Sequence, residues 1–164
     1  MLYENEIDIP FYHVNTGYHH LETHELGIRL QERYRIKVKT FRPETSVEDY
    51  EAANGQVYRQ NPGRCCHDRK YEVMRRIAPS LKAWIVGIRR DQSRLHAGSS
   101  ILDWDERFGL IRIAPLARWT KGCVWEKIHR ERIPYHSLLD QGYIQVSCAP
   151  CTATDLSDEL MTSG

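Results

Sequence analysis

Four of the five cysteines in this chain form two close pairs: the adjacent Cys65 and Cys66, and the Cys-Ala-Pro-Cys motif from Cys148 to Cys151. Short spacings of this kind are typical of metal and cluster sites. Thiolates are soft ligands, so they select zinc, copper(I) or iron-sulfur clusters over hard cations. A ligand shared by both pairs requires a fold that brings these two distant segments together. Cys123 stands alone.

Composition indicates a cytoplasmic protein with one hydrophobic core. The 164 residues are 41% hydrophobic, which suffices for one ordinary core. The sequence has no apolar run of about 18 residues that would cross a membrane, and its first residues carry acidic groups where a signal peptide has basic ones. Because cytosolic thiols stay reduced, the close cysteine pairs predict metal binding or redox chemistry more than a structural disulfide.

Positive and negative charges nearly balance over the whole chain, but one segment has a local excess of positive charge. The formal net charge of +1 argues against a protein that coats nucleic acid through overall positive charge. Between Arg64 and Arg94, however, the sequence has nine Lys or Arg residues and three acidic ones. This window predicts either a solvated basic helix face or the neighbourhood of an anion.

Hydrophobic patterning and capping signals predict strands that alternate with helices. The expected strands span residues 9–14, 36–41, 83–88 and 110–116. The expected helices span residues 21–34, 67–77 and 120–133, with a capped helical turn from Ser46 to Gly55. The expected apolar face of the first helix consists of Leu21, Leu26, Ile28 and Leu30. The apolar run at 83–88 has the pattern of a strand covered on both faces.

This alternation implies right-handed crossovers, and therefore an α/β fold with a mostly parallel sheet and helices on both faces. Ligands of such sheets bind at the carboxyl ends of the strands. Two segments fall there, the turn Asn15-Thr16-Gly17 and the segment from Gly87 to Arg94. No domain boundary is evident, so residues 1–152 are expected to form one domain, followed by a flexible polar tail at residues 153–164.

The expected helix start favours ionised thiols in the first cysteine pair. If the helix begins at His67, Cys65 and Cys66 lie at or just before its start. Free amide N–H groups and the helix dipole lower the pKa of a cysteine at such a position.

Six motifs occur in an order and spacing that resemble one protein family. They are Asn15-Thr-Gly-Tyr-His-His-Leu-Glu-Thr23, Cys65-Cys-His-Asp-Arg-Lys70, Ala83-Trp-Ile-Val-Gly-Ile-Arg-Arg-Asp-Gln-Ser93, Ile113-Ala-Pro-Leu-Ala-Arg-Trp-Thr120, Ile133-Pro-Tyr135, and Gly142-Tyr143 leading to Cys148-Ala-Pro-Cys-Thr152. By these motifs the chain resembles the assimilatory sulfonucleotide reductases, specifically the bacterial adenylyl-sulfate reductases. The resemblance implies an adenine-nucleotide alpha-hydrolase-like (Rossmann-like) fold and assigns residues 1–152 to a partial sulfonucleotide reductase domain.

The resemblance also implies a 4Fe-4S cluster held by Cys65, Cys66, Cys148 and Cys151. Such a cluster distinguishes adenylyl-sulfate reductases from relatives that use the 3'-phosphorylated sulfonucleotide without one. Lys70 matches a family lysine between cluster and substrate, where a cation couples two anions. Its alternative is an ordinary solvated helix lysine. The implied activity is the thioredoxin-dependent reduction of adenylyl sulfate to sulfite and AMP in sulfate assimilation.

A substrate-binding set follows from the same resemblance. The turn after the third strand resembles the family's sulfonucleotide-binding element, and arginine suits it because its planar fork makes two hydrogen bonds to a phosphate or sulfate. Val14 and Gly87 would offer backbone groups to adenine, and Thr16 a hydroxyl near the phosphate. A turn residue that bonds its own backbone is an equal alternative for Thr16. The implied residues of the turn are Arg89, Arg90, Gln92, Ser93 and Arg94.

Two motifs of the family are missing from the sequence. One is the Ser-Gly-Gly-x-Asp-Ser phosphate loop after the first strand, and the other is the Glu-Cys-Gly-x-His tail whose cysteine attacks the sulfate sulfur. No cysteine follows Cys151, and smaller departures are Asn15, Ala114 and Cys123. The chain is therefore expected to be a reductase core truncated at both ends. The rest of a longer gene, a complementing chain or another subunit of a homo-oligomer would complete it.

Two other functions remain open. Four thiolates also suit a structural zinc site in a non-catalytic domain, although adjacent cysteines would be tightly constrained around one small ion. The fold also suits a degenerate adenine-nucleotide binder. Cys123 is expected to be a small buried hydrophobe rather than a replacement nucleophile. The histidines show no paired zinc-ligand spacing, and three of them are expected at the surface: His19, His20 and His24.

Overall fold

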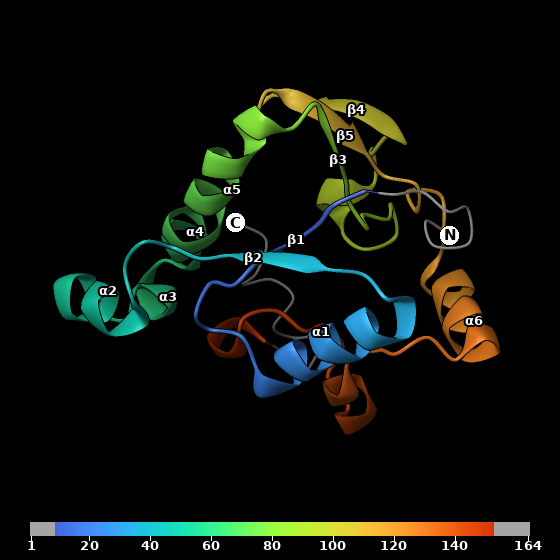
Figure 1. Ribbon diagram of the computed structural model, residues 1–164, viewed down its shortest axis with the longest axis horizontal. Coiled ribbons are helices and arrows are strands. Elements are labelled where there is room, and N and C mark those ends of the chain that lie inside the picture. The colour runs from blue at the N-terminus through green and yellow to red at the C-terminus, as the bar shows by residue number, and fades with distance from the viewer. Residues whose placement is uncertain (1–8, 153–164) are drawn as a thin grey trace. The chain divides into compact units, whose positions relative to one another are not determined.

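The computed structural model describes residues 9–152, which fall into two compact units (Figure 1). The first unit takes its residues from Met1–Val73 and Pro134–Gly164, and the second from Met74–Ile133. The tail expected at residues 153–164 lies outside the described residues.

A strand-helix-strand element opens the first unit. β1 (Phe11–Val14) and β2 (Val38–Phe41) pair in parallel, with Phe11 opposite Val38 and Val14 opposite Phe41. α1 (Leu21–Tyr34) connects the two strands. Both strands are shorter than expected, whereas the predicted bounds of the helix are confirmed.

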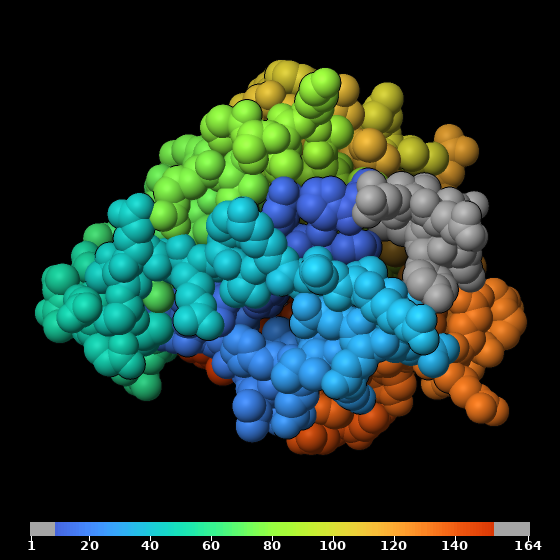
Figure 2. All heavy atoms as spheres, in the orientation of Figure 1, coloured from blue at the N-terminus to red at the C-terminus, as the bar shows by residue number. Residues whose placement is uncertain are grey.

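The prediction of an apolar face on α1 is confirmed for only two of its four residues. Leu21 is 69% exposed and Ile28 55% exposed, whereas Leu26 and Leu30 are half-buried. Spacing along the helix explains the difference. Residues 26 and 30 are four apart and lie on one side of the helix, which is half-buried. Residues 21 and 28 are seven apart and lie on another side, which is exposed. Figure 2 shows atoms of α1 at the surface of the molecule.

α2 (Val47–Asn54) begins and ends at the residues that the capping signals predicted. The Ser46 hydroxyl accepts a hydrogen bond from the Asp49 N–H at 3.0 Å and donates one to the Asp49 carboxylate at 3.0 Å. Gly55 has a φ of +70°, which favours glycine, and its N–H donates to the Glu51 carbonyl at 2.7 Å. Both predicted caps are confirmed. The short α3 (Val57–Gln60) follows.

The helix that carries the first cysteine pair starts earlier than expected. It consists of α4 (Pro62–Cys66), a π-helical turn η2 (His67–Tyr71) and α5 (Glu72–Ile77). The Asn61 side-chain oxygen accepts the Arg64 N–H at 2.9 Å, and Pro62 takes the first position, where its missing N–H is not needed. The predicted start at His67 is therefore wrong, because the Asn-Pro pair is the actual start signal.

A cysteine belongs to the core of the first unit. Tyr50, Val57 and Cys65 are buried together, and Tyr18 and Tyr58 pack against them. Two short 3-10 turns complete the described part of this unit, η5 (Ser137–Gln141) and η6 (Ala149–Cys151).

The second unit contains a three-stranded sheet in the order β3-β5-β4. Its strands are β3 (Ala83–Ile85), β4 (Leu102–Asp105) and β5 (Leu110–Ile113). β3 pairs with β5 in parallel, and β4 pairs with β5 in the antiparallel direction. The other elements are the 3-10 turns η3 (Ala78–Ser80) and η4 (Arg94–His96) and the helix α6 (Lys121–Glu131). The two parallel pairings, β1 with β2 and β3 with β5, confirm the predicted α/β class with mostly parallel strands.

Two strands of this sheet differ from expectation. β3 ends at Ile85, which is 39% exposed, so the strand is not covered on both faces as predicted. β4 was not predicted, because aspartate is depleted in strands, although Asp103 and Asp105 keep the alternation of apolar and polar residues that a strand has. In the folded sheet both carboxylates face Arg112 of β5, at 2.7 and 3.9 Å. A charge pair across two strands is invisible to a pattern that is read along one strand.

Candidate functional site

The two cysteine pairs both lie in the first unit. Cys65 and Cys66 end α4, while Cys148 precedes η6 and Cys151 ends it. Burial, followed by the neighbouring Cys66, Cys151 and Cys148, raises the pKa of the Cys65 thiol to about 11. Burial, and with it Cys148, also raises the pKa of Cys66 and of Cys151. The two distant pairs therefore lie close enough in the first unit for their charges to act on one another.

The predicted lowering of the cysteine pKa values at a helix start is wrong. Cys65 lies inside α4, where its N–H already donates to the Asn61 carbonyl at 3.1 Å, and it is only 7% exposed. Desolvation therefore outweighs the helix dipole, and the thiol pKa rises. A soft metal centre that binds these thiols would replace their protons.

The donor set fits a soft metal centre. Cysteine sulfurs in fours are ligands of structural zinc and of iron-sulfur clusters. Within residues 9–152, no group of three or more His, Cys, Asp or Glu side chains is already placed to hold a metal ion. The side chains whose chemistry suits such a centre are Cys65, Cys66, Cys148 and Cys151.

A buried turn after β1 touches the second cysteine pair. The Thr16 hydroxyl lies 3.2 Å from the Cys148 sulfur, and it also accepts the Tyr18 N–H at 3.3 Å. The Asn15 side chain accepts the Gly17 N–H at 2.9 Å, which closes the turn. Thr16 therefore bonds its own backbone, as one alternative predicted, and also contacts a cysteine sulfur. Sequence reasoning missed this second contact, because no local signal reports a neighbour so distant in the chain.

Hydrogen bonds connect the segment with the second cysteine pair to the residues just before α1. His20 Nε2 lies 2.9 Å from the Thr152 hydroxyl oxygen, and the Thr152 hydroxyl donates to the Cys148 carbonyl at 3.0 Å. The Ala149 N–H donates to the Tyr18 carbonyl at 2.7 Å. The prediction that His20 is a surface residue is wrong, because it is half-buried and holds this segment.

Three histidine rings gather beside this site. The His13 and His19 ring centroids are 5.1 Å apart, and His24 lies 6.4 and 6.0 Å from them. Burial, followed by the charges that His13, His24, Lys70 and His20 can carry, lowers the pKa of His19 to about 4. His13 Nε2 and His19 Nδ1 are buried without a hydrogen-bond partner among the described residues. The predicted surface position is wrong for the half-buried His19 and confirmed for the exposed His24.

Lys70 lies one helical turn beyond Cys66 and is exposed. Burial raises the pKa of Cys66, and the charge of Lys70 opposes that effect, so the ammonium group is close enough to act on the thiol. Lys70 therefore supplies positive charge beside the cysteine site. Its contact with a substrate stays a prediction.

The predicted nucleotide-binding segment follows β3 in the second unit. Arg89 is half-buried, and five residues of the segment are exposed: Gly87, Arg90, Gln92, Ser93 and Arg94. Arg89 Nε donates to the Asp91 carboxylate at 2.9 Å, and Arg90 Nε donates to the Ser99 carbonyl at 2.8 Å. The segment lies at the carboxyl end of a strand, as expected, and Val14 has the corresponding place at the end of β1.

Asp91 organises this segment and was missed in the sequence. Besides binding Arg89, its carboxylate accepts the N–H of Lys121, the first residue of α6. That backbone bond, and after it the Arg89 guanidinium, holds the pKa of Asp91 below its usual value. The acidic residue within the Arg-Arg-Asp sequence was the available signal, because arginines without an anionic ligand commonly pair with a nearby carboxylate.

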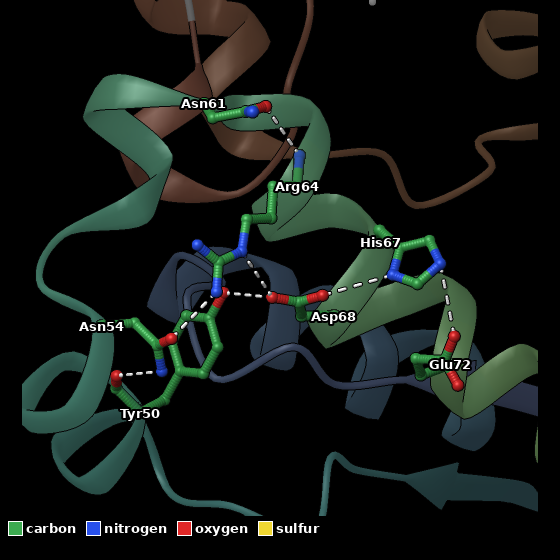
Figure 3. A network of polar contacts seen from close by, with 7 residues as sticks. All are labelled: Tyr50, Asn54, Asn61, Arg64, His67, Asp68 and Glu72. Carbon is green, nitrogen blue, oxygen red and sulfur yellow. Dashed lines mark hydrogen bonds and ion pairs between the residues drawn. The ribbon is translucent and has the colours of Figure 1, made fainter.

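Some of the positive charge between Arg64 and Arg94 is paired with polar and acidic side chains of the first unit. Figure 3 shows Arg64 reaching the Asn54 side chain at 2.9 Å and the Asp68 carboxylate at 3.6 Å. The Tyr50 hydroxyl donates to the same carboxylate at 2.7 Å, and His67 contacts it at 3.2 Å. Some of the local positive excess therefore balances charge within the fold.

Solved structures show which fold the chain has. A crystal structure of phosphoadenylyl-sulfate reductase from Candida auris, in a phosphate complex, matches with a TM-score of 0.80 and 22% identity, over 93% of this chain and 74% of that one. A crystal structure of the FMN adenylyltransferase of Candida glabrata, in complex with FAD and pyrophosphate, matches with a TM-score of 0.67 and 15% identity. That match covers 95% of this chain and 50% of the other. The fold is of the adenine-nucleotide alpha-hydrolase-like class.

Sequence comparison identifies the family within that class. The phosphoadenosine phosphosulfate reductase domain matches residues 1–154, and the chain belongs to this family. The predicted resemblance is thereby confirmed.

Curated relatives share the chain's sequence over most of its length. The adenosine 5'-phosphosulfate reductase of Staphylococcus haemolyticus is 31% identical over 100% of this chain and 68% of its own length. The enzyme of Bacillus pumilus is 36% identical over 92% of this chain and 66% of its own length. Adenosine 5'-phosphosulfate reductase 1 of Bacillus subtilis is 32% identical over 100% of this chain and 71% of its own length. The chain thus spans about two thirds of each of these relatives. Among the described residues, no helix is long and apolar enough to cross a membrane.

Proposed function

We propose that this chain is the cluster-binding core of an adenylyl-sulfate reductase, which reduces adenylyl sulfate to sulfite and AMP with electrons from thioredoxin in sulfate assimilation. The observation that carries the proposal is that two distant cysteine pairs lie in one unit, where hydrogen bonds tie the second pair to the turn after β1 and burial, followed by the neighbouring thiols, raises the pKa of Cys65 and Cys151. Family membership supports it, as do relatives named adenosine 5'-phosphosulfate reductase. The cytoplasm is the proposed location.

The proposed cofactor is a 4Fe-4S cluster on Cys65, Cys66, Cys148 and Cys151. A cluster offers each sulfur its own iron, which suits the adjacent pair better than one small zinc ion does. When bound, it would supply an anionic iron-sulfur group next to the substrate. The chain's own contribution is the charge of Lys70, which already acts on Cys66 and can attract the sulfate end of an incoming substrate.

Residues at the carboxyl ends of β1 and β3 are proposed to bind the nucleotide. Val14 and Gly87 would offer backbone groups to adenine, and Thr16 a hydroxyl toward the phosphate. The exposed segment after β3 can present planar guanidinium groups to phosphate or sulfate oxygens, with Asp91 fixing the direction of Arg89. The proposed members of this segment are Arg89, Arg90, Gln92, Ser93 and Arg94.

Turnover also needs a nucleophilic thiol. The thiol sulfur attacks the sulfur of adenylyl sulfate, the bond from that sulfur to the bridging oxygen breaks, and AMP leaves while the thiol proton passes to solvent. The thioredoxin dithiol then gives two electrons to the resulting thiosulfonate, which releases sulfite and restores the thiol. Apart from the two pairs, the sequence contains Cys123, which was expected to be buried but is an exposed residue of α6 in the second unit. We propose that a segment or subunit beyond this sequence supplies the nucleophile.

Anaerobic purification followed by iron, sulfide and zinc analysis tests the cofactor. A brown protein with iron and sulfide in equal amounts is expected, whereas a colourless zinc protein would favour a structural site instead. A sulfite-release assay with adenylyl sulfate and thioredoxin tests the reaction, with Cys123→Ser as the matched control. Multiple turnovers by the chain alone would overturn the proposal of an external nucleophile. Calorimetric binding of AMP and adenylyl sulfate, without iron and without turnover, would indicate a degenerate nucleotide binder.

A further inference from the structure

Arg69 is a buried cation beside the cysteine site. It is 3% exposed and follows the first cysteine pair in the π-helical turn of the same helix. A guanidinium remains charged at physiological pH, so its burial requires compensating hydrogen bonds. Nε donates to the Thr16 carbonyl at 2.7 Å, and Nη1 donates to the carbonyls of Thr45 and Ser46, both at 3.2 Å. One side chain therefore joins the cysteine helix to the turn after β1 and to the start of α2.

Two aromatic rings complete the surroundings of this guanidinium. Its central carbon lies 5.4 Å from the Tyr18 ring centroid and 5.2 Å from that of Tyr50. Flat contact with a ring face is favourable for a guanidinium. The same rings pack around Cys65, so Arg69 is built into the core beneath the first cysteine pair.

The turn after β1 rests directly on Arg69. Gly17 has a φ of +88°, and a Cβ at this position would lie 3.0 Å from Arg69 Nη2 and 2.5 Å from Val47 Cγ2. Thr16, whose carbonyl Arg69 holds, places its hydroxyl 3.2 Å from the Cys148 sulfur. The guanidinium, the turn and the second cysteine pair thus form one continuous chain of contacts.

We propose that Arg69 is a positioning residue that fixes the Asn15–Gly17 turn and thereby sets the contact between the Thr16 hydroxyl and the Cys148 sulfur. Lysine cannot replace it, because a compact ammonium lacks the planar fork that reaches carbonyls on two segments while its central carbon lies over two tyrosine rings. The effect on a bound cluster rests on the proposed function, since hydrogen bonds to ligand sulfurs tune cluster potentials. The positioning of the turn does not depend on a cluster.

The test compares Arg69→Lys, Thr16→Val and their combination in the full chain. Arg59→Lys is the matched control, because Arg59 is an exposed arginine of α3 whose guanidinium lies 5.9 Å from the Tyr58 ring centroid. Amide hydrogen exchange of the metal-free protein should accelerate about tenfold or more at Gly17 and Tyr18 in Arg69→Lys, because the turn loses a hydrogen bond to a charged group. It should stay at the wild-type rate in Arg59→Lys.

Thr16→Val keeps the backbone carbonyl that Arg69 binds, so exchange at Gly17, whose N–H donates to Asn15, should stay near the wild-type rate. Exchange at Tyr18 should rise in this variant, because its N–H loses the Thr16 hydroxyl. Exchange at Gly17 that accelerates as much in Thr16→Val as in Arg69→Lys would overturn the proposal, because the hydroxyl would then hold the turn. If Arg69→Lys does not fold, Thr16→Val alone still tests the proposal, because an acceleration of about tenfold at Gly17 in that variant would overturn it.

The midpoint potential of iron-loaded protein gives a second readout. Arg69→Lys and Thr16→Val should shift it in the same direction, and the combined variant should shift it no further than Thr16→Val alone. Fully additive shifts would show that Arg69 does not act through Thr16. Absence of iron from the wild-type chain would count against the proposed function, and the hydrogen-exchange comparison would still decide the role of Arg69.

Discussion

The cysteine site of the first unit and the arginine segment of the second are built in opposite ways. Around the cysteines, the side chains that hold the site are buried, and hydrogen bonds tie Thr16, Arg69 and His20 to other segments. In the arginine segment, most candidate ligands are exposed, and Arg89 is held by the carboxylate two residues away. Exposed ion pairs contribute little stability, whereas removing a partner from a buried polar group is costly. The first region is therefore preorganised, and the second can change partners when an anion arrives.

The largest effect is expected from a cluster ligand. Cys66→Ser should abolish the binding of iron and sulfide, because an alcohol is a poor ligand for a soft metal. Cys123→Ser, which changes an exposed cysteine of the second unit, should retain the wild-type content. Elemental analysis of both variants, purified anaerobically, checks the result. Equal iron in the two variants would remove Cys66 from the ligand set.

Gly17, which follows the buried Asn15 and Thr16, should be the next most sensitive position. Gly17→Ala is expected to lower the free energy of unfolding by about 1–3 kcal/mol, because φ is +88° and the added Cβ would meet Val47 Cγ2 at 2.5 Å. Gly27→Ala is the control, since Gly27 lies inside α1 with open space around it, and it should raise stability by about 0.5–1 kcal/mol. Urea denaturation measures both. Equal stability of the two variants would contradict a tightly packed turn.

An arginine in the exposed segment should affect binding but not folding. Arg89→Gln is expected to weaken adenylyl sulfate binding about tenfold at low salt, with a smaller loss at high salt, and to leave the unfolding midpoint unchanged. Arg107→Gln, at an exposed arginine of the same unit whose guanidinium lies 6.0 Å from the Phe108 ring centroid, should leave affinity unchanged. Titration calorimetry at two salt concentrations provides the measurement. If affinity is equal in both variants, Arg89 is not a substrate ligand.

The histidine cluster should make the first unit sensitive to acid. An unfolded histidine binds its proton near pH 6.5, whereas the folded pKa of His19 is about 4, so between these values the unfolded state holds the extra proton. The free energy of unfolding should therefore fall as pH falls through this window, by at most about 1.4 kcal/mol per pH unit for this group.

Variants separate His19 from the other titrating groups. His19→Gln should flatten the decline in stability between pH 6.5 and 4, while His129→Gln, at an exposed histidine of α6, should not. Denaturation midpoints across that pH range provide the comparison. The groups that face His19 are His13, His24, His20 and Lys70, and an unchanged slope in His19→Gln would show that His19 is not the source of the acid sensitivity.

The sequence predicted correctly those features that depend on neighbouring residues alone. The bounds of α1 and the caps at Ser46 and Gly55 follow from the residues on either side, and all are confirmed. The cysteines and the turn after β1 were also found in the sequence, because glycine, asparagine and cysteine carry strong positional signals.

Sequence reasoning failed where distant segments decide the outcome. Burial of Cys65 reversed the expected direction of its pKa shift, and the anchoring contact of His20 with Thr152 has no signature near either residue. β4 was missed because Arg112, its charge partner, lies on another strand. In each case the deciding term is desolvation or pairing across the fold, and neither can be read along one segment.

The π-helical turn from His67 to Tyr71 limits how the sequence can change in length. In this turn Arg69 is buried and the next residue, Lys70, is exposed. Loss or gain of one residue would rotate everything beyond that point by about 100° relative to the cysteines. The lysine would then turn away from the thiols, and the arginine away from the turn that it supports. Of the two residues between Cys66 and Arg69, the exposed His67 can change in identity, whereas Asp68 is half-buried and bonds the Tyr50 hydroxyl.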